Sequence, residues 1–175
     1  MAEQNPVLEA IRARRSIRRY TDEPLRKEDV ARILEAGRWA PSGRNNQAWR
    51  FLALRADDPR ADALARCTKY TRIVKNASAL ICLFLEKARM YDARKDHQGA
   101  GACMQNMLLA AHSLGLGGLW IGEIVNQSRQ VSDALGLDAE KLELQAVLAL
   151  GYPAEAGGAD RLPLETLLLE QLWQD

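Results

Sequence analysis

The chain has 175 residues, of which 47% are hydrophobic and 27% are charged, and its formal net charge at pH 7 is +1. These values predict a single domain over residues 1–175 with enough apolar side chains for a sizeable core. The balanced charge argues against nucleic acid as a partner. A membrane is not expected either, because no apolar run approaches the ~20 residues that a membrane helix needs.

The three cysteines, Cys67, Cys82 and Cys103, are widely spaced and form no CxxC pair. This spacing argues against a metal or iron–sulfur site, so no metal is expected. An odd number of cysteines, two of them inside apolar runs, favours reduced thiols in a cytoplasmic protein. The N-terminus lacks the apolar core of a secretion signal.

The first predicted helix runs from residue 6 to about residue 18. Asn5 is a good N-cap, and Pro6 suits the first helical position. The apolar positions at helical spacing, which predict a buried face, are Val7, Leu8 and Ile11.

The segment from Arg12 to Tyr20 concentrates five arginines and one serine in nine residues. An arginine presents a planar fork of donors that matches a phosphate, and a serine hydroxyl can add a short hydrogen bond. The segment can therefore bind a phosphate monoester. Two alternatives remain at this point: a solvated basic helix end, and a nucleic-acid contact.

Hydrophobic periodicity predicts that helices and strands alternate irregularly along the rest of the chain. The run 79–85 is apolar throughout, which is typical of a central strand buried on both faces. Because βαβ units are few, an α+β fold around a mainly antiparallel sheet is predicted. The predicted helices cover residues 27–39, 57–67, 96–114 and 128–135, and the predicted strands cover 49–54, 79–85 and 142–150, with a short strand inside 115–122.

The loop 41–49 reads PSGRNNQAW and is dense in amides and hydroxyls. Such side chains can read a heterocycle whose edge alternates donors and acceptors, or they can satisfy the backbone of their own loop. The glycine-rich segment 115–122 can approach a ligand closely or can serve as a tight helix-to-strand connection. It does not match the dinucleotide-binding GxGxxG pattern.

The helix 96–114 is apolar almost all round from its middle on, so it is expected in the core or in a subunit interface. Its two histidines, His97 and His112, have no metal-ligand or nucleophile partner at motif spacing, and structural roles are expected for both. The C-terminal tail carries leucines and a tryptophan at helical spacing. We expect this tail to cover either its own core or that of a partner.

Four motifs in order, which together span nearly the whole chain, resemble the FMN-dependent nitroreductase family and specifically its short members. They are RRSIR at 14–18, APSGRNNQAW at 40–49, QNMLLAA at 105–111 with GLG at 115–117 and WIG at 120–122, and GYP at 151–153 with RLP at 161–163. Two positions depart from the pattern: Ala48 stands where the family usually has proline, and Ala159 stands where some members carry a lysine.

The resemblance implies FMN as the cofactor and a role for each matching residue. Arg14, Arg15, Ser16 and the distant Arg161 would contact the phosphate and ribityl chain, and Arg18 the pyrimidine edge of the flavin, where a cation stabilises the reduced state. The loop on the isoalloxazine, which in this family comes largely from the partner subunit, would use Pro41, Ser42, Gly43, Asn45 and Gln47. The segment whose backbone N–H faces flavin N5 would be Trp120, Ile121 and Gly122.

The resemblance also implies an intertwined homodimer, in which the tail 162–175 packs on the partner subunit. The implied reaction is ping-pong: NADH or NADPH gives a hydride to flavin N5, and a small-molecule oxidant such as a nitroaromatic or a quinone is then reduced. No catalytic side chain is required, because the flavin supplies the chemistry. The alternatives are a specialised flavin dehydrogenase or dehalogenase, and a flavin-binding redox sensor with little turnover.

Overall fold

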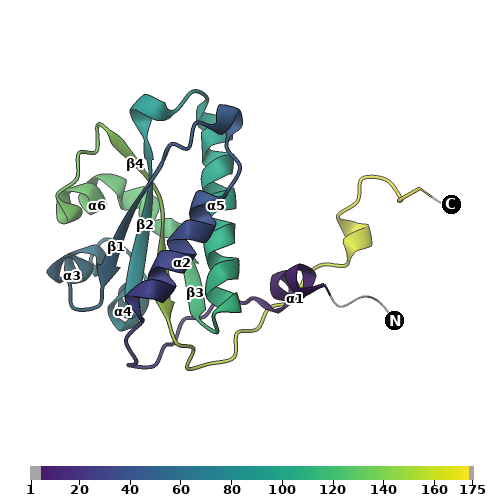
Figure 1. The fold of residues 1–175 in the computed structure, drawn as a ribbon, viewed down its shortest axis with the longest axis horizontal. Helices are drawn as coiled ribbons and strands as arrows, with labels where there is room; N and C mark the ends of the chain where they lie inside the picture. The colour runs from purple at the N-terminus through teal and green to yellow at the C-terminus, as the bar shows by residue number, and fades with distance from the viewer. Residues whose placement is uncertain (1–4, 174–175) are drawn as a thin grey trace.

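The computed structural model describes residues 5–173 (Figure 1). Its helices are α1 (Pro6–Ala13), α2 (Lys27–Arg38), α3 (Pro59–Ala65), α4 (Thr71–Asn76), α5 (Ala93–Ser113) and α6 (Ser128–Leu135). Its strands are β1 (Trp49–Arg55), β2 (Ala79–Glu86), β3 (Gly117–Ile121) and β4 (Leu142–Gly151). Short 3₁₀ turns cover η1 (Gly43–Asn45), η2 (Lys87–Arg89), η3 (Glu123–Gln127) and η4 (Leu164–Thr166).

The four strands form one sheet in the order β1-β2-β4-β3, and every neighbouring pair is antiparallel. The prediction of an α+β fold with an antiparallel sheet is therefore confirmed. Strand β2 lies at the centre and is buried along all but its last residue, as its unbroken apolar run predicted. The register pairs Ile81 of β2 with Leu148 of β4, and both side chains are fully buried.

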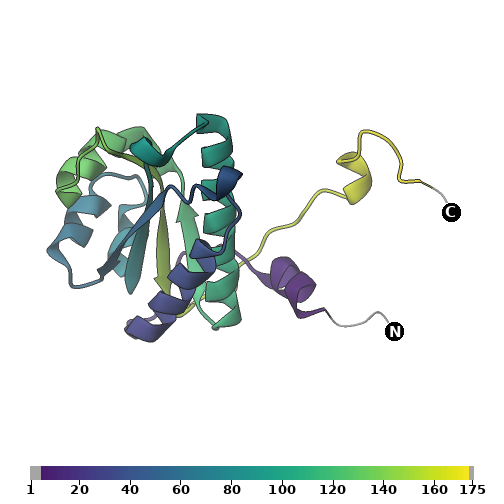
Figure 2. The ribbon, with the colours of Figure 1, turned by 45° about the horizontal axis from the view of Figure 1, so that its top comes forward.

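Helices cover both faces of the sheet (Figures 1 and 2). On one face α2 and α5 pack over the sheet, with Ile33, Met104 and Met107 buried against it. On the other face α3, α4 and α6 contribute buried side chains such as Leu64 and Val131. Each such side chain stabilises the fold by about 1.5–3 kcal/mol through removal of its apolar surface from water.

The first helix ends at Ala13, so the prediction that it continues to about residue 18 is wrong. Arg14 has extended backbone angles (φ −55°, ψ 131°), and Ser16 forms a parallel bridge with Gly118 of β3. The N–H of Ile17 donates to the carbonyl of Gly118 at 3.1 Å, and the Ile17 side chain is buried. The segment pairs with the edge of the sheet and does not continue the helix, because this pairing supplies backbone hydrogen bonds and also buries the Ile17 side chain.

The face of α1 that the sequence pattern assigned to a core is exposed in this chain. Val7, Leu8 and Ile11 are 62%, 50% and 48% exposed. Asn5 caps the helix as predicted, because its side chain accepts hydrogen bonds from the N–H groups of Val7 and Leu8. Helix α1 and the tail both stand away from the body of the domain (Figures 1 and 2), so no part of the described chain covers this apolar face.

The tail is regular only over the single turn η4, so its leucine spacing does not produce a longer helix within the described residues. Leu164 and Leu167 are 58% and 62% exposed. The other predicted elements lie within a few residues of their expected bounds, while α4 was not predicted because six residues are too short for a clear period. Among residues 5–173, none of the helices combines the length and hydropathy needed to cross a bilayer.

A glycine is required where the Arg14–Ile17 segment meets β3. A Cβ on Gly117 would lie 2.8 Å from Cβ of Ile17. We expect Gly117→Ala to lower the free energy of unfolding by about 1–3 kcal/mol, the scale of an overpacked core. Urea denaturation measures this change, and the matched control is Gly158→Ala, because nothing lies within 4 Å of a Cβ there. Equal stability of the two variants would contradict the packing of Ile17 on β3.

Candidate functional site

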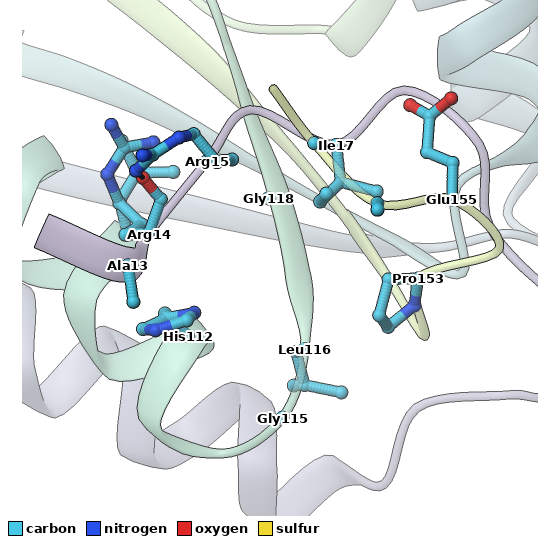
Figure 3. A pocket seen from close by; sticks show the side chains of 13 residues that line it. Ala13, Arg14, Arg15, Ile17, His112, Gly115, Leu116, Gly118, Pro153 and Glu155 are labelled. Atoms are coloured by element: carbon cyan, nitrogen blue, oxygen red, sulfur yellow. Dashed lines mark hydrogen bonds between the residues drawn. The ribbon is translucent and has the colours of Figure 1, made fainter. Parts of the chain in front are cut away.

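The arginine-rich segment borders a cavity of about 300 Å³ at the C-terminal end of α5 (Figure 3). Arg14 and Arg15 lie on one side of this cavity, and both are half-buried. The end of α5 and the start of β3 form its floor. The lining residues are Ala13, Arg14, Arg15, Ile17, Leu108, His112, Gly115, Leu116, Gly118, Pro153, Glu155, Ala156 and Gly157.

The segment is held between β3 on one side and the chain after β4 on the other. The N–H of Ala154 donates to the carbonyl of Arg19 at 3.0 Å, and Tyr20 bridges to Pro153. A Cβ on Gly157 would lie 2.4 Å from Cβ of Arg15, so this glycine permits the close approach. Pro153, Glu155, Ala156 and Gly157 of the chain after β4 form one wall of the cavity.

Positive charges gather around Arg14, and among residues 5–173 no carboxylate forms an ion pair with Arg14, Arg15 or Arg161. Burial lowers the pKa of the Arg14 guanidinium, and the neighbouring charges of Arg161 and Arg15 lower it further. Within the described part of the chain, Nε of Arg14 is buried and has no hydrogen-bond partner. Three like charges and an unpaired buried donor favour an anion, because an anion would offset both the repulsion and the desolvation.

The Glu155 carboxylate lies across β3 from Arg14 and Arg15 (Figure 3) and is engaged elsewhere. It accepts a hydrogen bond from the N–H of Arg18 at 2.8 Å and pairs with Nε of Arg19 at 3.3 Å. These contacts fix the backbone of Arg18 while its guanidinium remains exposed. The hydroxyl of Tyr20 lies 2.8 Å from the carbonyl of Ile17, and burial raises the pKa of this hydroxyl.

Strand β3 connects the arginine cavity to the other predicted ligand segment. Gly118 contacts the Ser16 backbone, and Gly122 follows about 13 Å further along the strand direction. Ile121 is buried, whereas Trp120 is 40% exposed and presents its ring at the surface. A ligand that spans these two ends would lie along the outer edge of the sheet.

The polar loop has an unusual backbone. Arg44, Asn45 and Gln47 have φ angles of 54°, 54° and 47°, a region that residues other than glycine rarely occupy. The Gln47 N–H donates to Oγ of Ser42 at 3.2 Å, so one hydroxyl satisfies its own loop. Three such residues within four positions store strain, which is typical of a ligand-binding loop.

A buried carboxylate anchors this loop to the start of α5. Oδ1 of Asp96 accepts a hydrogen bond from Nδ2 of Asn46 at 2.6 Å, and Oδ2 accepts from the N–H groups of Tyr91 and Asp92, both at 3.0 Å. Burial alone would raise the pKa of Asp96, but these hydrogen bonds outweigh it, and the pKa lies below its ordinary value. Neither Asp96 nor Asn46 was predicted as a site residue, because the contact between them joins residues 50 positions apart in the sequence.

Within one chain the predicted site residues fall into two separate groups. A Cβ on Gly99 of α5 would touch the Pro41 carbonyl of the loop, and one on Gly101 would touch the Trp120 ring. Gly99 and Gly101 are two residues apart on α5, so they point in directions about 200° apart around the helix axis. Helix α5 therefore lies between the loop and Trp120. The first group contains Arg14, Arg15, Ser16, Arg18, Trp120, Ile121, Gly122 and Arg161, and the second contains Pro41, Ser42, Gly43, Asn45 and Gln47.

The two histidines have different surroundings. Nε2 of His97 lies 2.7 Å from Oε1 of Glu143, which links α5 to β4. His112 lines the arginine cavity (Figure 3), a location that its position late in a helix did not reveal.

The Nitroreductase family model matches this chain over residues 11–69 and 56–152. The chain belongs to the nitroreductase family. This membership confirms the family predicted from the four motifs.

Three known proteins show how far the similarity extends. A Desulfovibrio desulfuricans protein, assigned to the nitroreductases and crystallised in complex with FMN, is 56% identical with a TM-score of 0.96, over 98% of this chain and 99% of its own. The NADPH:FMN oxidoreductase of Vibrio harveyi, complexed with NAD⁺, is 28% identical with a TM-score of 0.86, over 98% of this chain and 79% of its own. A protein of Archaeoglobus fulgidus named for NADH dehydrogenase and NAD(P)H nitroreductase activity is 34% identical, over 85% of this chain and 86% of its own.

We expect Asp96→Asn to lower the free energy of unfolding by about 1–3 kcal/mol at neutral pH, because it removes a charged acceptor from buried donors. The folded-state pKa is depressed, so this stabilisation is complete above the ordinary aspartate pKa of about 4 and is lost as the pH falls through the folded value. Urea unfolding of both proteins between pH 3 and pH 7 measures the difference. The control is Asp57→Asn, whose side chain is 73% exposed. If the difference in free energy of unfolding between the two proteins is as large at pH 3 as at pH 7, the charge of the Asp96 carboxylate is not its cause.

Proposed function

We propose that this protein is an FMN-dependent oxidoreductase that uses NADH or NADPH to reduce nitroaromatic, quinone or similar acceptors. The observation that carries this function is the group of Arg14, Arg15 and Arg161, with a buried guanidinium nitrogen that lacks a partner among the described residues. The FMN complex of the Desulfovibrio relative and the NAD⁺ complex of the Vibrio relative support the cofactor and the donor.

The residues of the arginine cavity fit a phosphate monoester. We assign Arg14 and Ser16 to bind it, with Arg15 and Arg161 adding positive charge. Of these four residues, Arg14 and Arg15 line the cavity, and Arg161 is close enough to lower the pKa of Arg14. One part of the Arg15 guanidinium is already occupied, since it donates to the backbone carbonyls of Arg12 and Arg14. Arg14, whose Nε is unpartnered, is therefore the residue on which phosphate affinity depends most.

The flavin, when bound, supplies the redox chemistry by taking a hydride from the nicotinamide and passing reducing equivalents to the acceptor. The chain supplies orientation and charge. We assign Arg18 to the pyrimidine edge, where its exposed cation would favour the reduced, negatively charged state. We assign the backbone of Trp120, Ile121 and Gly122 to the redox-active centre of the ring. No side chain is assigned as a general acid or base.

We further propose that two chains form each complete site as a homodimer. The loop 41–47 lies on the opposite side of α5 from Trp120, so a second copy is needed to bring a loop to each flavin. The exposed apolar side chains of α1 and of the tail support this assembly, because apolar surface of that extent is normally covered. We propose that the tail 162–175 packs on the partner; residues 174–175 lie outside the described residues.

The names of the relatives favour the reductase over a specialised dehydrogenase or dehalogenase and over a redox sensor. The cytoplasm is the proposed compartment. The three cysteines support this proposal, because all of them are buried free thiols.

Turnover is tested by anaerobic stopped-flow mixing of the FMN-loaded protein with NADH and, separately, with NADPH. We expect the flavin absorbance to bleach rapidly with at least one donor and to recover when a nitroaromatic or a quinone is added. The control is the same protein mixed with NAD⁺, which cannot reduce the flavin. Bound flavin that neither donor reduces would contradict the reductase and favour the sensor.

The phosphate assignment is tested by Arg14→Ala. We expect this change to weaken FMN binding by about 1.5–3 kcal/mol, which is roughly 10- to 150-fold in Kd, because a charged hydrogen bond is lost in a partly buried site. Fluorescence titration of the apoprotein with FMN measures the affinity. Arg12→Ala is the matched control, because Arg12 is exposed and does not line the cavity. Equal FMN affinity of the two variants would show that the phosphate binds elsewhere.

A further inference from the structure

A second cavity, of about 310 Å³, lies between the polar loop and the first turns of α5. It is far from the arginine cavity, because α5 extends about 20 Å between Gly99 and His112. Its lining residues are Pro41, Ser42, Gly43, Tyr91, Lys95, Gln98, Gly99 and Ala102. None of the roles assigned above accounts for Tyr91 or Lys95.

Two cations lie near the ring of Tyr91: Lys95, which lines the cavity, and Arg44, which follows the lining residue Gly43 but is not itself a lining residue. Cζ of Arg44 is 5.0 Å from the ring centroid, and Nζ of Lys95 is 5.5 Å from it. Both distances fall within the range of cation–π attraction. The two side chains are therefore drawn to one ring, although they come from the loop and from α5.

The positive charge of this pair is largely uncompensated. Within residues 5–173, the Arg44 guanidinium forms no ion pair and no hydrogen bond. Lys95 has one carboxylate neighbour, since its Nζ lies 4.0 Å from Oδ2 of Asp92, at the outer limit for an ion pair. The carboxylate of Asp96 is buried and already accepts three hydrogen bonds.

The backbone on both sides of Tyr91 holds these groups in place. Oη of Tyr91 lies only 1.8 Å from the position that a Cβ on Gly43 would occupy, so the ring is seated directly on the loop. Asp96 ties Asn46 of the loop to the N–H of Tyr91. Arg44 adopts a left-handed backbone conformation, which aims its side chain from a fixed turn. Cations held in advance of binding lose less entropy when a ligand arrives.

We propose that Arg44 and Lys95, seated on Tyr91, form an anion-recognising lip that binds a phosphate or carboxylate group of the nicotinamide donor or of the acceptor. This inference rests on the proposed function, because it places the lip beside the loop assigned to the isoalloxazine. It adds a ligand class: substrates that carry a negative charge away from the reacting ring are preferred over neutral ones. Arginine supplies a planar fork for such a group, and lysine supplies a compact charge.

The test uses the FMN-loaded protein and the variants Arg44→Gln and Lys95→Gln. The matched control is Arg94→Gln, because Arg94 precedes Lys95 and is exposed, and within residues 5–173 it forms no cation–π contact with Tyr91. The KM and kcat values are measured for NADH and NADPH with a neutral acceptor, and then for 4-nitrobenzoate and 4-nitrobenzyl alcohol with one donor. Calorimetric binding of the two nitro compounds to the oxidised protein gives a second readout that needs no turnover.

We expect each lip variant to raise the KM or Kd of the anionic ligand about three- to tenfold, the scale of a partly exposed charge pair. The kcat and the values for 4-nitrobenzyl alcohol should change less than twofold, and Arg94→Gln should resemble the unmodified protein. A change for NADPH alone would identify the 2′-phosphate as the anion, an equal change for both donors would identify the pyrophosphate, and a change for 4-nitrobenzoate alone would identify the acceptor.

Two outcomes would overturn the proposal that the lip binds an anion. One is an unchanged affinity for all the anionic ligands, and the other is an equal loss for charged and neutral ligands, which would indicate a structural role for the two residues. Failure of the proposed function gives a different result, because the unmodified protein would then bind no FMN or would show no bleaching by either donor. Calorimetry with 4-nitrobenzoate would still decide whether Arg44 and Lys95 bind an anion.

Discussion

The pairing of Ser16 with Gly118 is the contact on which the arrangement of the site depends. A short sheet-like bridge and the burial of Ile17 draw the arginine-rich segment out of the first helix and onto the edge of β3. Without this pairing the arginines would be distributed around a helix and would face several directions. With it, Arg14 and Arg15 face the same cavity as the end of α5. The chain after β4 then covers the segment from the other side, with Gly157 allowing the close approach.

Helix α5 organises the other half of the molecule. It is buried against the sheet through Met104 and Met107, and it also separates the polar loop from Trp120. The same geometry that gives the domain its core therefore keeps the two groups of predicted site residues apart within one chain. Two observations that look unrelated in the sequence belong together here. The apolar face of α1 is exposed, and the loop 41–47 lies across α5 from Trp120. The proposed homodimer would account for both of them.

The two cavities achieve their positive charge in different ways. Around Arg14 the arginines are partly buried, repel one another and leave a donor nitrogen without a partner, which is a high-energy arrangement that an anion relieves. Around Tyr91 the cations are exposed and are held by an aromatic ring and a strained loop. The first arrangement suits a permanently bound phosphate. The second suits a ligand that must arrive and leave in each catalytic cycle.

The amino-acid sequence by itself determined the family, the antiparallel α+β class and most of the elements. Strand β2 was predictable because a run of seven apolar residues is typical of a strand buried on both faces. Helix α6 was predictable because its helical spacing stops at Gly136, which adopts the left-handed conformation common after the last turn of a helix. Such signals are local: a side chain's neighbours along the chain and its hydrophobicity are enough to read them. The phosphate-binding potential of the arginine segment was visible for the same reason.

Only the tertiary structure decided where the first helix ends, what anchors the polar loop and which residues share a cavity. The end of α1 depends on Gly118, about a hundred residues away, and the loop depends on Asp96, 50 positions from Asn46. The lip at Tyr91 combines Arg44 with Lys95, two residues that have no common motif. Contacts of this kind arise from chain folding, because a hydrogen bond or a cation–π pair depends on distance in space and leaves no periodic trace in the sequence.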